Sequence, residues 1–214
     1  YLGRWLARLH QIGNDYRFQH RPIWNGKAEL GHAKNKTIIQ QSCETVLNSG
    51  LLHEDFKIAY ESLCRDLNEL VEQQYQPELS DTIRIHGDCH VGNLLWRDEQ
   101  LYMVDFDDCV QGPAMQDIWM LLSGEREEQL QQLDAIRKGY EVFRPFPYHQ
   151  LEWIESLRTI RLIRHTAWVA ERWTDPAFPL AFPWFTGVQY WSGHVLALRE
   201  QLSALQEEPL FIHE

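Results

Sequence analysis

The sequence predicts a mainly α-helical protein with a small β region, and two observations carry this prediction. Apolar residues recur at helical spacing over most of the 214 residues, whereas short runs typical of strands are confined to residues 82–104. The charged content of 24% and the aromatic content of 12% are typical of a packed globular chain and argue against a disordered one. We therefore expect a helical body that carries a β island.

The first half of the chain begins with a helical pattern and ends in the β island. Leu2, Trp5 and Leu9 recur at helical spacing with no capping residue before them, so we expect the chain to be a piece of a longer protein. Polar residues 97–100 separate the last two strand-like runs, which indicates a hairpin. The predicted elements are a helix at 1–10, a packed loop at 13–31, helices at 36–47 and 54–74, and strands at 82–85, 94–96 and 101–104.

The second half returns to helical patterns after Gly112 and Pro113. In the last predicted helix, Trp191, Val195 and Leu198 share one face. A segment with three prolines and four aromatic residues precedes that helix and is expected to be a packed loop. The predicted helices span 117–123, 127–143, 151–172 and 191–207, and the packed loop spans 175–185.

Composition excludes several classes of protein. Twenty basic against 31 acidic residues give a net charge of −11, which argues against a nucleic-acid partner. A membrane-spanning helix needs about 20 consecutive apolar residues, and no run approaches that length, so we expect no membrane partner. The start of the chain lacks the pattern of a signal peptide. The four cysteines are dispersed without a CxxC motif, which is typical of reduced thiols in a cytoplasmic protein.

The densest polar chemistry lies in residues 86–93 and 105–108. Asp88 and Asn93 lie five positions apart on one loop, and antiparallel pairing within residues 94–104 would bring Asp105 beside Asn93. Phosphoryl transfer from ATP needs a carboxylate that accepts the proton of the attacking hydroxyl, and hard oxygen ligands for Mg²⁺. We therefore expect these three side chains to converge on a divalent cation.

The segment His86-Gly87-Asp88-Cys89-His90-Val91-Gly92-Asn93, followed by Asp105-Phe106-Asp107, resembles the protein-kinase catalytic loop and its D-F-G. The match is closer to the aminoglycoside phosphotransferase and choline-kinase branch, whose pattern is H-G-D-x-H-x-x-N and then D-[FW]-[DE]. The resemblance implies a kinase-like C-terminal lobe. In that lobe, Asp88 is the catalytic base, and Asn93 and Asp105 are Mg²⁺ ligands.

The same resemblance assigns supporting roles to four more residues. His86 corresponds to the structural histidine of the loop, and Asp117 to the helix-start aspartate that braces it. Asp107 and His90 are implied as auxiliary residues near the metal and the substrate. The family also implies that ATP is the co-substrate.

The flanking sequence most resembles the bacterial stress response kinase A subfamily, which implies phosphorylation of protein serine or threonine. Gly87, Asp107 and His90 depart from the protein-kinase pattern, in which Arg, Gly and Lys stand at these positions. These departures suit the small-molecule branch, so amino-sugar, choline or homoserine kinases remain the alternative. No Gly-rich loop and no V-A-I-K-type lysine precede the catalytic loop. Residues 1–214 are therefore expected to be a C-terminal lobe without its nucleotide lobe.

Two other classes remain open. Residues 87–90 match the fragment G-D-x-H of metal-dependent phosphatases, although no H-x-H or G-N-H-[DE] segment completes that set. A non-catalytic pseudokinase is the second, but the presence of all three polar residues argues against it. A catalytic Cys89 is disfavoured, because adjacent side chains on an extended segment point in opposite directions.

The helix expected at 151–172 carries a row of arginines. We expect Arg158, Arg161 and Arg164 to form a solvated face paired with Glu152 and Glu155. The alternative is a basic edge of the substrate cleft. The aromatic residues between positions 173 and 184 are expected to pack rather than to form an exposed docking patch.

Overall fold

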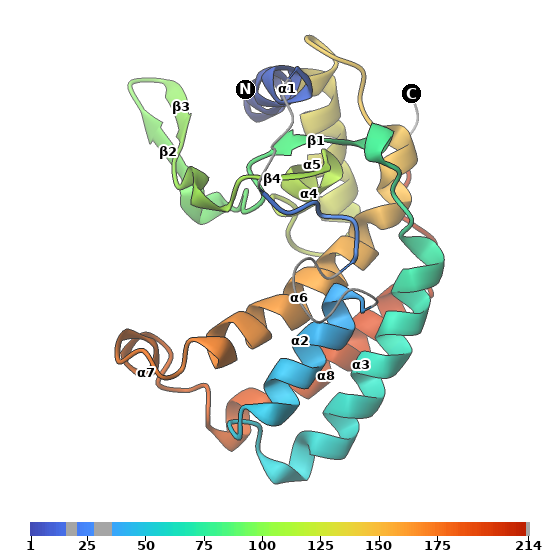
Figure 1. The fold of residues 1–214 in the computed structure, drawn as a ribbon. Coiled ribbons are helices and arrows are strands. Elements are labelled where there is room, and N and C mark those ends of the chain that lie inside the picture. The colour runs from blue at the N-terminus through green and yellow to red at the C-terminus, as the bar shows by residue number, and fades with distance from the viewer. Residues whose placement is uncertain (16–20, 28–35, 213–214) are drawn as a thin grey trace. The chain divides into compact units, whose positions relative to one another are not determined.

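The computed structural model describes residues 1–15, 21–27 and 36–212, which fall into two compact units (Figure 1). The first unit comprises residues 1–25, 77–154 and 209–214, and the second comprises residues 26–76 and 155–208. Helices predominate in the described residues, and the strands form two small antiparallel sheets. The predicted fold class is therefore confirmed. The assignment of the whole chain to a C-terminal lobe stays a prediction.

In the first unit, helices surround a two-stranded sheet. Strands β1 (Thr82–Ile85) and β4 (Val110–Pro113) pair antiparallel, and helix α1 (Leu2–Asn14) packs against β1 and against α5 (Arg126–Tyr140). The short helix α4 (Met115–Trp119) follows β4 directly. Because α4 starts beside the end of the sheet, its first turn lies close to the loop that leaves β1, as Figure 1 shows.

The second sheet is a hairpin of β2 (Leu94–Arg97) and β3 (Gln100–Met103), which projects from the first unit in Figure 1. Its two turn residues, Asp98 and Glu99, have φ values of 51° and 58°. Two left-handed residues define a type I′ turn, whose twist matches that of the strands. The predicted hairpin is confirmed.

The strands of the β island at residues 82–104 are divided between the two sheets. Residues 82–104 do not form one sheet, because β1 pairs with β4 rather than with the hairpin. Strand β4 was not predicted, since Gly112 and Pro113 give it the sequence of a turn. Its strand conformation depends on neighbours distant in the sequence: β1 on one side and a bridge from Ile23 to Gln111 on the other.

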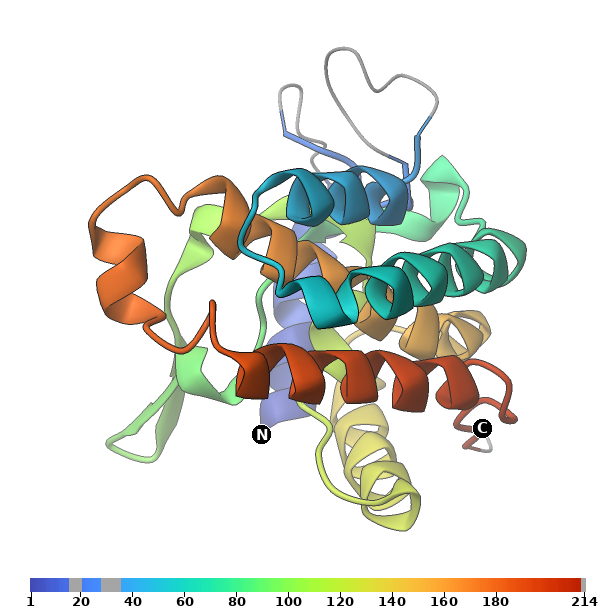
Figure 2. The same cartoon turned by 90° about the horizontal axis from the view of Figure 1, so that it is seen from below.

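The second unit is built from helices. They are α2 (Ile38–Asn48), α3 (Glu54–Gln74), most of α6 (Ile154–Glu171), the short α7 (Ala177–Ala181) and α8 (Val188–Ala204). Figure 2 shows α2, α3 and α8 running beside one another, in agreement with the contacts of α3 with both others. Fully buried Tyr60, Phe185 and Trp191 form the centre of this unit.

The helices expected at 36–47, 127–143, 151–172 and 191–207 differ from α2, α5, α6 and α8 by one to three residues at their ends, and two further segments differ more. The helix expected at 117–123 begins at Met115 and ends at Trp119, and the loop expected at 175–185 contains α7. Both segments are only five residues long, so hydrophobic periodicity does not define them. The loop expected at 13–31 lies partly outside the described residues.

The arginine row and the aromatic segment of the second unit take part in local packing. Arg158 Nη1 lies 3.6 Å from Glu155 Oε1, one helical turn away, as the pairing prediction expects. The ring centroid of Trp168 lies 5.0 Å from that of Phe178, and the Arg172 guanidinium lies 4.9 Å from the Trp168 ring. Within the described ranges, every helix is too short or too polar to cross a bilayer.

Candidate active site

The loop that leaves β1 carries Asp88 and Asn93 and is closed by its own hydrogen bonds. The Nδ2 of Asn93 donates to the carbonyl oxygen of Asp88 at 2.9 Å, and the Nδ1 of His90 accepts from the Gly92 amide at 2.9 Å. The Nε2 of His90 lies 3.6 Å from the Asp88 carboxylate. Asn93 is buried, whereas the Asp88 side chain keeps 18% exposure. The loop therefore leaves the Asp88 carboxylate partly exposed, with its Oδ1 atom buried, while hydrogen bonds hold the backbone.

The β2–β3 hairpin returns the chain to Asn93. Leu94 pairs with Met103, and the ladder continues with a 3.1 Å hydrogen bond from the Val104 amide to the Asn93 carbonyl. Asp105 is the next residue, and its carboxylate is exposed. Its backbone is left-handed, with φ 63° and ψ 63°. Such a conformation costs a non-glycine residue about 1–3 kcal/mol and is found most often at functional sites.

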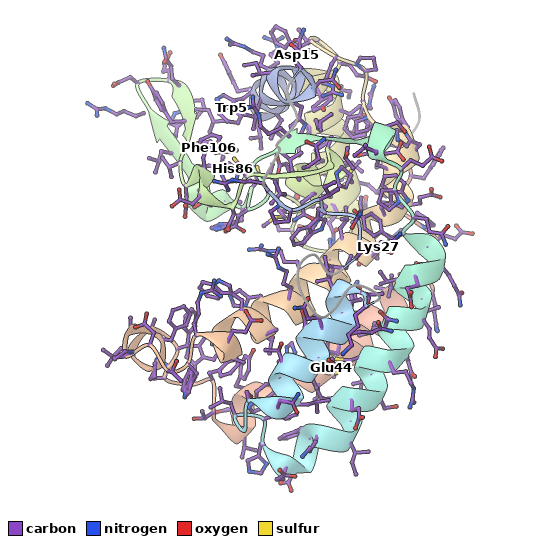
Figure 3. All side chains as sticks on the ribbon, viewed as in Figure 1. Trp5, Asp15, Lys27, Glu44, His86 and Phe106 are labelled. Atoms are coloured by element: carbon purple, nitrogen blue, oxygen red, sulfur yellow. The ribbon has the colours of Figure 1, made fainter. Side chains whose placement is uncertain are left out.

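His86 joins the two segments. Its fully buried ring accepts the Asp88 amide on Nδ1 at 3.3 Å and lies 2.9 Å from the Val104 carbonyl through Nε2. Because an amide can only donate and a carbonyl can only accept, the proton lies on Nε2. The ring also packs on Phe106, with centroids 4.8 Å apart, and Figure 3 shows the two side chains together at the root of the hairpin. One imidazole thus fixes the spacing between the Asp88 loop and the Asp105 segment.

Gly87 permits a close approach of these same two segments. Its φ is +87°, and a Cβ atom placed on it would lie 2.4 Å from the Asp108 carbonyl oxygen. Any side chain would push the Asp105–Asp108 segment away from the loop. This is a physical reason why the arginine of protein kinases is absent here.

Asp117 holds the beginning of the loop from below. Its buried carboxylate accepts the His86 amide on Oδ2 at 2.8 Å and the Gly87 amide on Oδ1 at 2.9 Å. His10 Nε2 lies 3.0 Å from the same Oδ2, and Tyr140 Oη lies 2.8 Å from His10 Nδ1. The position expected for a bracing aspartate is thus part of a longer buried network.

The Asp107 segment is held through its backbone. Arg21 donates to the carbonyl oxygen of Asp107 and, at 3.0 Å, to that of Cys109, while the Asp107 carboxylate is exposed. A cavity of about 350 Å³ lies beside this contact. Its lining residues all belong to the first unit: Leu9, Arg21, Arg84, Ile85, His86, Phe106 and Cys109.

Cys89 is unsuited to nucleophilic chemistry. Its thiol is fully buried, and burial raises its pKa, with smaller contributions from the carboxylates of Asp117 and Asp88. A nucleophilic cysteine needs the opposite shift, because the thiolate is the reactive form. The geometry therefore agrees with the prediction that Cys89 is not catalytic.

The side chains near Asp88 offer oxygen atoms, which are the ligand type that a hard divalent cation takes. Because Nδ2 of Asn93 is used by the Asp88 carbonyl, Oδ1 is the atom that a cation would contact. Within residues 1–15, 21–27 and 36–212, no group of three or more His, Cys, Asp or Glu side chains is arranged as a complete metal site. Mg²⁺ commonly takes only one or two protein carboxylates and completes its shell with phosphates and water.

Sequence reasoning did not find His10, Tyr140 or Arg21. His10 shares the buried face of α1 with Leu6, so its pattern is that of an ordinary core residue. Arg21 and Tyr140 lie in segments without a motif. The available signal was the presence of a polar histidine on an otherwise apolar helix face.

The fold and the loop geometry define a kinase-like phosphotransferase domain. Residues 1–154 match the phosphotransferase enzyme family (APH), so the chain belongs to this family. It is 40% identical over 209 residues to stress response kinase A of Escherichia coli K12, and similarly to the serine/threonine protein kinase RdoA of Salmonella typhimurium LT2. Each match covers 98% of this chain and 60% of the relative. The chain therefore spans about three fifths of the length of these proteins.

Solved structures with low sequence identity share the fold. A microcompartment-associated aminopropanol kinase aligns with a TM-score of 0.63 at 19% identity, over 95% of this chain and 62% of that one. Amicoumacin kinase, solved in complex with AMP-PNP, Ca²⁺ and Ami, aligns with a TM-score of 0.61 at 17% identity, over 100% of this chain and 60% of that one. These likenesses establish the kinase-like architecture.

Proposed function

We propose that the full-length protein is an ATP- and Mg²⁺-dependent kinase that phosphorylates serine or threonine of a protein. Relatives at 40% identity carry the names stress response kinase A and serine/threonine protein kinase RdoA, which favours a protein acceptor. Residues 1–214 are assigned to the C-terminal lobe, and the nucleotide lobe to the part of the relatives outside this match. Four free thiols are compatible with a cytoplasmic protein.

One observation carries this proposal: the hydrogen bond between the Val104 amide and the Asn93 carbonyl. It fixes the hairpin register so that Asp105 follows directly beside Asn93, while the Asn93 amide holds the Asp88 loop. Residues twelve positions apart would thereby supply neighbouring oxygen donors. This is the donor arrangement that phosphoryl transfer requires.

The residues would divide the work as follows. Asp88 would orient the acceptor hydroxyl and take its proton. Asn93 Oδ1 and the Asp105 carboxylate would hold Mg²⁺, which supplies charge neutralisation on the phosphates when bound. His86 and Asp117 would position the loop, and Asp107 and His90 would act as auxiliary groups at its edge.

A small hydroxyl compound is the second candidate acceptor. The observation that favours it is the close approach at Gly87, which leaves no space for the arginine of protein kinases. Amino sugars, choline-like amino alcohols and homoserine all present a suitable hydroxyl.

The test uses the full-length protein with ATP and Mg²⁺, followed as ADP release. Asp88→Asn should reduce turnover by about 10²–10⁴-fold, the usual contribution of a general base. Asn93→Ala and Asp105→Asn should raise the Mg²⁺ concentration needed for half-maximal rate. The matched control is Asp98→Asn, which changes a carboxylate with 80% exposure at the far end of the same hairpin and should leave the rate unchanged.

Three results would contradict the proposal. Near-normal turnover by Asp88→Asn would remove the base assignment, and unchanged metal dependence in the other two variants would remove the ligand assignment. Hydrolysis of p-nitrophenyl phosphate without ATP consumption would favour a phosphatase. Mass spectrometry of the products separates the acceptors, since phosphoserine or phosphothreonine indicates a protein and phosphorylation of a panel of amino alcohols and amino sugars indicates a small molecule.

A further inference from the structure

Three helices of the first unit contribute to one buried chain of hydrogen bonds. Tyr140 on α5 contacts His10 on α1, and His10 contacts Asp117 on α4, over distances of 2.8 and 3.0 Å. All three residues are fully buried. These helices lie together beside β1 in Figure 1. This series of hydrogen bonds ends at the amides of His86 and Gly87, the two residues that precede Asp88.

The directions of these hydrogen bonds follow from the chemistry of the partners. Backbone amides only donate, so Asp117 accepts from His86 and Gly87 and uses both of its oxygens. The Asp117 carboxylate accepts a third hydrogen bond from His10, so the proton of the His10 ring lies on Nε2. His10 Nδ1 is then left as an acceptor for the hydroxyl of Tyr140.

We propose that Tyr140 is a positioning residue for the catalytic loop and acts through His10 and Asp117. Its hydroxyl holds the imidazole in the tautomer and the orientation that donate to Asp117. Asp117 in turn holds the two amides that begin the loop. A phenylalanine at this position would leave His10 Nδ1 buried without its donor, so the ring would gain freedom to rotate.

The surroundings of Tyr140 indicate that its hydroxyl has a role beyond filling the core. The ring already has apolar neighbours: its centroid lies 5.6 Å from that of Phe146. Phenylalanine would keep this contact, because it differs from tyrosine only by the hydroxyl. The variant Tyr140→Phe therefore isolates the hydrogen bond from the filling of the core.

The expected effect of Tyr140 on catalysis rests on the proposed function. Its effect on the loop can be measured without any assay of activity. Hydrogen exchange at the His86 and Gly87 amides reports how firmly Asp117 holds the loop, with or without activity. In the full-length protein, Tyr140→Phe should speed exchange at these two amides by roughly three- to tenfold, the value of one net hydrogen bond. The turnover number with ATP and Mg²⁺ should fall by a similar factor, while the KM for ATP stays unchanged.

Two further variants make the result specific. Tyr148→Phe removes another tyrosine hydroxyl of the first unit, which donates to Glu141 at 2.7 Å and has no link to the loop, so exchange and turnover should not change. His10→Leu fills the space of the imidazole but removes both hydrogen bonds through which Tyr140 reaches Asp117. In that background, Tyr140→Phe should have less than about a twofold further effect.

The outcomes separate the two proposals. Unchanged exchange at His86 and Gly87 in Tyr140→Phe, or an equal effect of that change in the His10→Leu background, would overturn the role of Tyr140. Faster exchange at these amides in a protein that never consumes ATP would support the hydrogen-bonded chain and overturn the kinase proposal.

Discussion

The two compact units bury different kinds of interior. The first unit encloses a carboxylate, two histidines and their hydrogen-bond partners directly beneath the candidate catalytic loop. The second unit encloses a group of aromatic rings, with Phe185 and Trp191 5.3 Å apart and Tyr60 and Trp191 6.0 Å apart. Aromatic burial stabilises through area and dispersion, whereas a buried carboxylate is costly unless every partner is in place.

This difference shows which of the two interiors fixes the positions of individual atoms. In the aromatic interior, rings of similar size can substitute for one another with modest loss. In the polar interior, the position of each donor is fixed by an acceptor on another helix. We therefore expect equal losses of stability in the two units to have unequal consequences for the loop.

The largest expected effects come from removing one central residue of each interior. Asp117→Ala should lower the free energy of unfolding by about 3–5 kcal/mol, because it leaves three buried donors without their acceptor. Trp191→Ala should cost a similar amount, about 3–5 kcal/mol, through the cavity that it leaves. Chemical denaturation measures both losses.

The comparison is then made by hydrogen exchange at the His86 and Gly87 amides. Under native conditions, only Asp117→Ala should speed exchange at these positions. Equally fast exchange at the His86 and Gly87 amides in Trp191→Ala would show that the aromatic interior also holds the catalytic loop, and would contradict this comparison.

Two glycines provide a second comparison, because Gly87 and Gly50 both have left-handed backbones, with φ values of +87° and +71°. A Cβ atom at Gly50 would meet nothing within 4 Å, whereas at Gly87 it would collide with the Asp108 carbonyl. Gly50→Ala should therefore lower the free energy of unfolding by only about 1–2 kcal/mol, the cost of a left-handed backbone at alanine. Gly87→Ala should cost about 3 kcal/mol or more, because the clash adds to the same term.

Denaturation curves of these two alanine variants provide the measurement. Activity adds a second one, since displacement of the Asp105–Asp108 segment should reduce turnover in Gly87→Ala alone. A smaller stability loss in Gly87→Ala than in Gly50→Ala would contradict the close approach.

The smallest effect concerns a histidine in the aromatic interior. Burial, and to a smaller extent the nearby His165, lower the pKa of His194 from 6.5 to about 4. As the pH falls, the unfolded chain takes up a proton on His194 near pH 6.5, whereas the folded protein takes it up only near pH 4. The contribution of neutral His194 to stability is fully present above pH 6.5 and is lost as the pH falls toward 4. At pH 5, the free energy of unfolding is lowered by about 2 kcal/mol.

Unfolding in urea at pH 7.5 and at pH 5 tests this expectation. In His194→Gln, the difference in stability between the two pH values should shrink by about 2 kcal/mol relative to the unchanged protein. An unaltered difference would show that His194 is not the group that titrates.

Much of the candidate site was predictable because its residues are close in sequence. Asp88 and Asn93 share one loop, and the hairpin that returns Asp105 is signalled by two short apolar runs joined by a polar turn. The hairpin itself agrees with the prediction. The roles of Asp88, Asn93 and Asp105 stay predictions until activity is measured.

The sequence by itself determined the helical class, the hairpin and the order of the polar residues, since each of these depends on local periodicity and spacing. Only the tertiary structure decided that β4 is a strand, that Gly87 lies against Asp108, and that His10 contacts Tyr140 and Asp117. The partners of His10 lie 130 and 107 positions away along the chain. A hydrogen bond between such distant side chains leaves no periodic trace in one sequence, because it depends on the packing of helices whose own patterns record only which face is buried.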